Sequence, residues 1–98
     1  MIYHITSKYA WEKALSLGYY SAESLEIEGF IHCSKKEQVN GVLERYYQGA
    51  RDLVILTIDP GKLEHSLRYE LAPSVQEEFP HIYGTINLDA VVQVETIN

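Results

Sequence analysis

The chain has 98 residues, a formal net charge of −6 and 46% hydrophobic residues. This length fits one domain, because a second core would be too small to be stable by itself. The negative charge argues against a general DNA or RNA binder, which needs a basic surface to displace counterions from phosphates. No apolar stretch approaches the roughly 20 residues that cross a bilayer, so we expect no membrane association.

The amino terminus and the cysteine usage bear on the location of the protein. The segment MIYHITSKYA lacks the charged start and the long apolar run of a signal peptide. Cys33 is the single cysteine and cannot form an internal disulfide. A free cysteine is typical of a reducing compartment, and we therefore expect a cytoplasmic protein.

The first half of the chain predicts two strand–helix units. Residues 1–5 (MIYHI) are β-formers, and Ser7 can then cap a helix that ends at Gly18. Its apolar stripe is expected to contain Ala10, Trp11, Ala14 and Leu15.

Residues 19–28 carry no clear signal, whereas residues 29–34 indicate a second strand. Ser34 and Glu37 have the spacing of a capping box, which predicts a second helix that Gly49 closes.

The second half reads mainly as strands. Residues 53–58 form a nearly unbroken apolar run, typical of a central strand covered on both faces. After a turn at residues 59–61 and a short helical turn, residues 67–71 indicate another strand. Residues 72–80 contain acids and two prolines without periodicity and are predicted to be a loop, and two last strands are expected at 82–87 and 91–97. The order β-α-β-α-β-β-β predicts an α+β domain.

A histidine stands at the end of the second predicted strand. On an extended backbone, Ile31 and Cys33 share the core face, while Phe30, His32 and Ser34 share the other. His32 would then lie beside a helix amino terminus, where amide groups and the helix dipole favour an anion. The alternative is a structural histidine that bonds to the backbone and closes the helix end.

The segment FPHIYG, residues 79–84, is the second candidate site. His81 and Tyr83 point the same way on an extended backbone, and Gly84 permits a close approach to the main chain. An imidazole beside a phenol can hold a hydroxyl-rich ligand. The alternative is a tyrosine-anchored loop that packs on the edge of a sheet.

Four other residues have open roles. His4 is either a ligand contact or a surface residue at a strand end, and His65 is expected on a solvated face. Glu70 could stabilise a cationic transition state, but pairing with Arg68, two residues earlier, is favoured. Arg45, next to two tyrosines, is a candidate phosphate clamp or an ordinary surface arginine.

Metal and thiol chemistry are less favoured. His32, His81 and Glu70 could form a two-histidine, one-carboxylate site, but no pair shows a tight ligand spacing such as H-x-x-x-H, so we predict no metal site. Cys33 is expected to face the core, which is unfavourable for a nucleophile.

Several segments together resemble the bacterial family known as domain of unknown function 952. They are IYHI, EGFIHCS, RYYQG, DLVILTID, RYE and FPHIYGTINLDAV, and the likeness covers essentially the whole chain. More distantly, residues 3–6, Gly18 and residues 31–34 resemble the opening of the RNA 2′-phosphotransferases. That resemblance implies the ADP-ribosyltransferase fold, a pair of small split sheets that hold NAD or ADP-ribose in a cleft.

The same resemblance implies residue roles. His4 would bind the adenosine-side ribose and His32 would help to hold the nicotinamide end. Ile5 stands where the phosphotransferases have a glycine, and their extra nucleic-acid-binding domain and arginine cluster have no counterpart here. Phosphate transfer from RNA is therefore not expected.

The leading hypothesis is a domain that binds an NAD-like, ADP-ribose-like or other phosphorylated nucleoside ligand, with glycosyl transfer or hydrolysis as the associated reaction. The candidate catalytic residues are His32, His81 and Glu70. The candidate binding residues are His4, Ser34, Arg45, Tyr83 and Gly84. The alternative is a non-catalytic module that senses a ligand or binds a protein partner.

Overall fold

Three small antiparallel sheets organise the chain, and the computed structural model describes residues 1–97 of it. The first sheet has the order β1-β4-β8, with β1 at Ile2–Ser7, β4 at Leu53–Ile58 and β8 at Val91–Thr96. The second has the order β3-β6-β5, with β3 at Ile31–His32, β6 at Glu77–Tyr83 and β5 at Ser66–Ala72. The third pairs β2 at Tyr19–Tyr20 with β7 at Ile86–Asn87.

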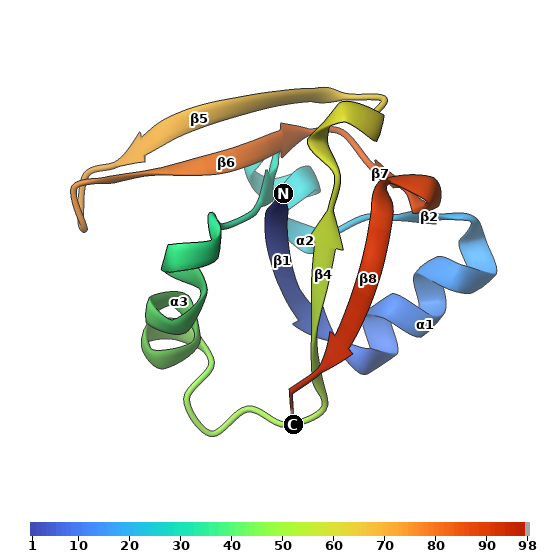
Figure 1. Cartoon of the computed structure of the whole chain (residues 1–98), viewed down its shortest axis with the longest axis horizontal. Helices are drawn as coiled ribbons and strands as arrows, with labels where there is room; N and C mark the ends of the chain where they lie inside the picture. Colours follow the sequence, from blue (N-terminus) through green and yellow to red (C-terminus); the bar gives the residue numbers. More distant parts are fainter. Residues whose placement is uncertain (98) are drawn as a thin grey trace.

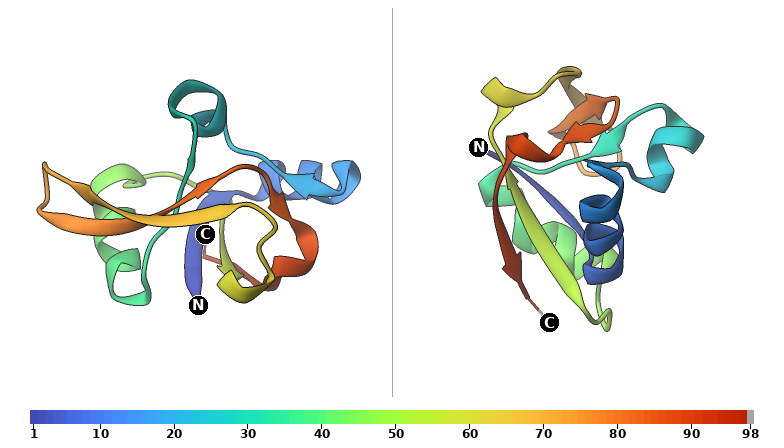
Figure 2. Two further views of the ribbon diagram at one scale, coloured as in Figure 1. Left: turned by 90° about the horizontal axis from the view of Figure 1, so that it is seen from above. Right: turned by 90° about the vertical axis from the view of Figure 1, so that its right-hand side faces the viewer.

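Helices flank these sheets, so the predicted α+β class is confirmed. They are α1 (Lys8–Leu17), α2 (Glu23–Glu28) and α3 (Val39–Tyr46), with short 3₁₀ turns at Lys36–Gln38, Pro60–Lys62 and Leu88–Ala90. The β5–β6 hairpin lies across one end of the β1-β4-β8 sheet, with α1 and α3 to either side (Figure 1). Figure 2 shows α1 running along one face of that sheet. Within residues 1–97 no helix has the length and apolar character needed to span a membrane.

Helix α1 begins and ends where the sequence predicts. The Ser7 hydroxyl accepts a hydrogen bond from the Ala10 amide at 3.0 Å, which satisfies one amide of the first turn. Gly18 ends the helix at φ 87°, a conformation that costs glycine little. Ala14 is buried, but Leu15 is 56% exposed, so its predicted place on the packed stripe is wrong.

Strand β4 is the central strand of its sheet, as predicted. It pairs along its whole length with β1 and along most of it with β8. Val54, Leu56 and Ile58 are buried, whereas Ile55 and Thr57 are only partly covered. The expectation that both faces are fully covered is therefore wrong for one of them.

The predicted faces of residues 30–33 are confirmed. Ile31 and Cys33 are buried in the core, while His32 is on the other face and exposed. Strand β3 itself has only two residues, shorter than expected. The segment without a clear signal forms β2 and α2, and α2 ends at Gly29.

The predicted capping box at Ser34 is wrong. The Ser34 backbone instead exchanges hydrogen bonds of 2.7 and 2.9 Å with Tyr3, which adds Ser34 to the edge of β1. The first turn is closed one residue later, where the Lys35 amide donates to the Gln38 side-chain carbonyl at 2.9 Å.

The strand predicted at 67–71 is confirmed as part of β5, but the loop predicted at 72–80 is too long. Only residues 73–76 form a turn, because β5 and β6 form a hairpin that is paired from Ser66↔Tyr83 to Ala72↔Glu77. Hydrogen bonds between the two backbones stabilise this exposed hairpin, although its sequence does not alternate between apolar and polar residues. Pro80 lies in β6, the middle strand of its sheet, although proline has no backbone N–H to donate. Pro80 takes part in the strand pairing through its carbonyl, which accepts a hydrogen bond from the Cys33 amide at 2.9 Å. The strand predicted at 82–87 is divided between β6 and β7, so the observed order contains more short elements than expected.

The core lies where α1 and the three sheets meet. Its members are Ile2, Ala14, Tyr20, Ile31, Cys33, Val54, Leu56, Ile58, Ile82, Ile86 and Ala90.

Candidate functional site

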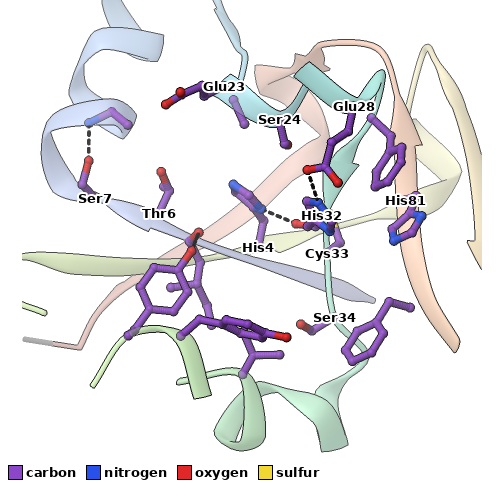
Figure 3. Close-up of a pocket in the computed structure, with 18 of the residues that line it drawn as sticks. His4, Thr6, Ser7, Glu23, Ser24, Glu28, His32, Cys33, Ser34 and His81 are labelled. Carbon is purple, nitrogen blue, oxygen red and sulfur yellow. Dashed lines mark hydrogen bonds and ion pairs between the residues drawn. The ribbon is translucent and has the colours of Figure 1, made fainter. Parts of the chain in front are cut away.

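A cavity of about 1050 Å³ opens between β1, α2, α3 and the turn of the β5–β6 hairpin. Four residues proposed from the sequence line it: His4 from β1, His32 from β3, Ser34 just after β3, and His81 from β6. Figure 3 shows the three histidines following one another along the cavity wall. The sheet pairing brings them together, because His32 and His81 are direct partners in the β3–β6 ladder.

Much of the remaining lining is aromatic or aliphatic. Phe79 and Val75 come from the hairpin, and Val42, Tyr46 and Tyr47 come from α3 and its end. Burial raises the pKa of the Tyr47 phenol, so it remains protonated. This part of the cavity suits a flat apolar ring.

His4 is buried, with 7% of its surface exposed, so it is not the surface residue considered as its alternative. Its Nδ1 lies 2.6 Å from the backbone carbonyl of His32, and its Nε2 lies 2.8 Å from the Tyr20 hydroxyl. A carbonyl can only accept, so Nδ1 carries the hydrogen and Nε2 accepts from Tyr20. Both ring nitrogens of His4 are thus occupied within the protein.

Tyr20 links His4 to a further hydroxyl. Its oxygen is 2.8 Å from the Thr6 side-chain oxygen, and because the Tyr20 hydrogen is directed at His4, Thr6 donates to Tyr20. Burial lowers the pKa of His4 to about 4 and raises the pKa of Tyr20 to about 12. The network is therefore uncharged at neutral pH, and it holds β1 to β2 and β3.

His32 is oriented by a carboxylate from α2. Its Nε2 is 2.9 Å from Glu28 Oε2, and both side chains are about half exposed. The structural alternative considered for His32, a bond from its ring to the backbone, is not what the structure shows; its backbone carbonyl serves His4 instead. Sequence reasoning missed Glu28 because residues 19–28 gave no helical signal.

His81 is oriented by a second carboxylate. Its Nδ1 is 2.7 Å from Glu70 Oε1, and the Tyr83 hydroxyl donates to the same oxygen. These hydrogen bonds, from Tyr83 first and His81 second, hold the pKa of Glu70 below its usual value, while the Glu70 carboxylate raises the pKa of Tyr83. The favoured pairing of Glu70 with Arg68 is wrong, because the Arg68 guanidinium lies over the Tyr83 ring, 5.1 Å from its centroid.

The other proposed residues do not line the cavity. Glu70 and Tyr83 are connected to it through His81. Arg45 has its guanidinium 5.7 Å from the centre of the Tyr46 ring, an ordinary surface arrangement. Gly84 does permit a close approach, as predicted, but the group that approaches is the ring of the exposed His65.

Phe30 is a residue whose role the sequence did not reveal. Its ring stacks on His81 with centroids 4.0 Å apart and 15° between planes, and it meets the edge of His32 at 4.9 Å. The alternation of residues 30–33 predicted that Phe30 shares a face with His32, and this was the only indication in the sequence that Phe30 lies near the histidines. Phe30 thus fixes the relative positions of the two histidines.

The described residues offer no metal centre. In residues 1–97, no three His, Cys, Asp or Glu side chains converge in a way that would hold an ion. His32 and His81 each use one nitrogen for a separate carboxylate, which divides the potential ligands between two pairs.

The whole chain resembles protein CC0527 from Caulobacter crescentus. The CC0527 crystal structure has a TM-score of 0.89 and 26% sequence identity, covering 99% of this chain and 85% of that chain. A double mutant of CC0527 gives the same values. Its solution NMR structure has a TM-score of 0.85 and 26% identity, covering 99% and 84% of the two chains. No curated protein matches the chain significantly.

The likeness to CC0527 extends across every element that forms the cavity, because almost the whole chain is covered. The family model described as "protein of unknown function (DUF952)" matches residues 5–94, which include His32, Ser34 and His81. The chain therefore belongs to the DUF952 family.

Proposed function

We propose that the cavity binds a nucleoside-type small molecule, such as an NAD-like, ADP-ribose-like or other phosphorylated nucleoside ligand. Two features of the lining support this proposal. Phe79, Tyr46 and Tyr47 offer rings against which a base can stack, and His32, His81 and Ser34 offer polar groups to ribose hydroxyls. A cavity of about 1050 Å³ is large enough for a ligand of this size.

The Ser34 side chain is the single observation that carries the proposal. Ser34 is only 5% exposed, yet within residues 1–97 its hydroxyl has no hydrogen-bond partner. Figure 3 shows this hydroxyl directed into the cavity. Among the described residues no buried side-chain oxygen lacks a partner, so the Ser34 hydroxyl reaches the open space of the cavity, where it is placed to bind a ligand.

The architecture supports an ADP-ribosyltransferase-like assignment as part of the same proposal. The β1-β4-β8 and β3-β6-β5 sheets are small, separate and adjacent to the cavity, as in a split pair of sheets around a cleft. His4 would act as a positioning residue, because both of its ring nitrogens are already bonded. Ile5 lines the cavity where the phosphotransferases have a glycine, so the ligand would sit further from β1.

Glycosyl transfer or hydrolysis at the ribose is the chemistry that this site would support. Such reactions pass through an oxocarbenium-like centre, which benefits from a nearby carboxylate and from a fixed ribose. Glu28 lines the cavity and supplies that carboxylate. The buried free thiol of Cys33 accords with a cytoplasmic setting for the reaction.

Ligand titration followed by amide NMR shifts tests the binding proposal. NAD, ADP-ribose, AMP and adenosine are added separately to the whole chain, with inorganic phosphate as a control. Shifts gathered around residues 4, 32, 34 and 81 are the expected result, and Ser34→Ala should weaken binding without changing the melting temperature. Shifts outside the cavity, or none with any of the four ligands, would contradict the proposal.

A surface beside α1 favours a second candidate function, a non-catalytic module that binds a partner. Tyr9 is 74% exposed, Leu17 50% and Tyr19 42%, and large apolar side chains gathered on an exposed surface are typical of an interaction site. A shallower groove of about 520 Å³ runs along Tyr9, Leu17 and Tyr19. In the same titrations, shifts confined to the residues around Tyr9, Leu17 and Tyr19 would favour this alternative.

A further inference from the structure

Two histidine–carboxylate pairs lie side by side in the cavity wall. His32 and His81 are register partners on β3 and β6, and their ring centroids are 5.3 Å apart at 77°. Each ring is held by its own carboxylate, His32 by Glu28 at 2.9 Å and His81 by Glu70 at 2.7 Å. Two imidazoles fixed in this way can act together as a proton donor and a proton acceptor.

His81 has the properties of a general base. Glu70 accepts from Nδ1, which places the ring hydrogen there and leaves a lone pair on Nε2. Nε2 has no partner within residues 1–97, and it is not among the buried unsatisfied atoms, so it reaches the open space of the cavity. The Phe30 ring covers one face of His81 and leaves the Nε2 edge for a ligand or a water molecule.

His32 has the properties of the complementary acid. Its side chain is about half exposed, and its Nε2 is occupied by Glu28 Oε2 at 2.9 Å. Nδ1 is then the atom that can donate to a ligand. His32 and His81 therefore differ in environment, which is the usual basis for different roles in acid–base catalysis.

The charges of the lining limit the ligand. Glu23 and Glu28 line the cavity with one arginine, Arg51, and no lysine is among the described residues that line it. Among the nucleoside-type ligands proposed above, NAD and ADP-ribose carry a pyrophosphate that would meet two carboxylates and one guanidinium. The charge of the lining therefore narrows the proposed class to a nucleoside without phosphate, which meets no such penalty.

Resting on the proposed nucleoside binding, we infer that this site hydrolyses the N-ribosidic bond of an uncharged nucleoside, with His81 as the general base. A water oxygen forms a bond to C1′ of the ribose and gives its proton to His81 Nε2. The bond from C1′ to the base nitrogen breaks, and its electron pair leaves with the base, which takes a proton from His32. Exchange with solvent then returns both histidines to their starting states, and the products are ribose and the free base.

Glu28 and Glu70 support this step in different ways. Glu28 lines the cavity and stabilises the positive charge that develops at C1′. Glu70 acts through His81 as a positioning residue, because its carboxylate selects the tautomer with Nε2 free. The charged or titratable groups that surround His81 are Glu70, Tyr83, its strand partner Arg68, and His32 with Glu28.

The test uses the whole chain with adenosine and inosine as probes and measures free base and ribose. We expect hydrolysis by the unaltered protein and a fall in kcat of about 10²- to 10⁴-fold in His81→Gln, the usual contribution of a general base. Glu70→Gln should lower kcat at unchanged KM and move the acidic limb of the pH–rate profile. His65→Gln is the matched control, since His65 is outside the cavity and should leave the rate unchanged.

The outcomes separate this inference from the proposed function. Cavity shifts with adenosine but no release of base would overturn the hydrolysis and leave nucleoside binding intact. No shifts with any nucleoside or nucleotide would contradict both. If His81→Gln and Glu70→Gln both hydrolyse the nucleoside at the rate of the unaltered protein, the role of His81 is overturned. Circular dichroism establishes that both variants are folded.

Discussion

The Nδ1 atom of His4 and the backbone carbonyl of His32 are joined by a 2.6 Å hydrogen bond between residues 28 positions apart. This bond connects β1 to β3 directly beneath the cavity wall (Figure 3). His4 therefore determines where the His32 main chain lies, and through the β3–β6 pairing it also influences the position of His81.

Replacing His4 with phenylalanine should destabilise the fold. The ring volume is nearly kept, but the His32 carbonyl and the Tyr20 hydroxyl lose their partner inside the protein. We expect the free energy of unfolding to fall by about 2–4 kcal/mol, since each buried unsatisfied group costs about 1–3 kcal/mol. Urea denaturation measures the change. His65→Phe, at an exposed site, should stay within about 0.5 kcal/mol of the unaltered protein, and an equal loss in both variants would contradict this role of His4.

Stability should decrease on mild acidification because of the same residue. The pKa of His4 is about 4 in the folded protein against 6.5 for an unperturbed histidine, so between these values the unfolded chain binds the extra proton. The free energy of unfolding should drop as pH falls from about 6.5 to about 4, by about 3 kcal/mol in total. Urea titrations across this range should show the slope in the unaltered protein and a clearly smaller one in His4→Phe. Equal slopes would mean that another group is responsible.

Gly84→Ala should destabilise the end of β6. A Cβ at this position would overlap with His65 Cγ and lie 2.7 Å from both His65 Cβ and Nδ1, so the His65 ring would have to move and lose its 2.9 Å contact with the Thr85 carbonyl. Overpacking of this kind typically costs about 1–3 kcal/mol. Thermal unfolding measures the loss, and the double variant Gly84→Ala with His65→Gly should recover most of it. Without that recovery, the clash would not be the cause.

Ser34→Ala should affect binding rather than stability. The Ser34 hydroxyl makes no hydrogen bond within the described residues, so its removal should change the free energy of unfolding by less than about 0.5 kcal/mol. A nucleoside ligand that uses the hydroxyl would lose about 0.5–1.5 kcal/mol, equivalent to a Kd raised roughly 2- to 13-fold. Calorimetric titration compares the two proteins. A marked loss of stability would show that the hydroxyl serves the fold instead.

The Cys33 thiol should be inert in the folded protein. Only 3% of Cys33 is exposed, and burial raises the pKa of its thiol, so little thiolate is available to react. Labelling with a thiol reagent should proceed no faster than unfolding and should become rapid in urea. Fast labelling under native conditions would contradict this and would make Cys33 a candidate nucleophile.

Local sequence signals predicted several elements correctly. Ser7 and Gly18 mark the two ends of α1, because a capping hydroxyl and a left-handed glycine act on the nearest backbone groups. The alternation around His32 placed Ile31 and Cys33 in the core, because opposite faces of a strand follow directly from its two-residue period. The family resemblance also followed from the sequence, since it depends on motifs along the whole chain.

Partners chosen by tertiary contacts were not predictable in the same way. Ser34 had the sequence pattern of a helix cap, but its backbone pairs with the edge of β1 instead. Glu70 forms hydrogen bonds with His81 and Tyr83 on β6 and does not pair with Arg68, which is closer in the sequence. The first half of β6, within residues 72–80, was predicted to be a loop because its stability comes from pairing with β5 and not from a periodic apolar face.

The sequence by itself determined the α+β class, the two ends of α1, the buried face of Ile31 and Cys33, and which histidines were worth considering. Only the tertiary structure decided that His4 is an internal support, that Phe30 and two carboxylates hold His32 and His81, and that Arg45 is outside the cavity. The physical reason is the separation along the chain over which each interaction acts. Helix caps and the alternating faces of a strand depend on residues a few positions apart, whereas the hydrogen bond from His81 to Glu70 forms only when β5 and β6 pair.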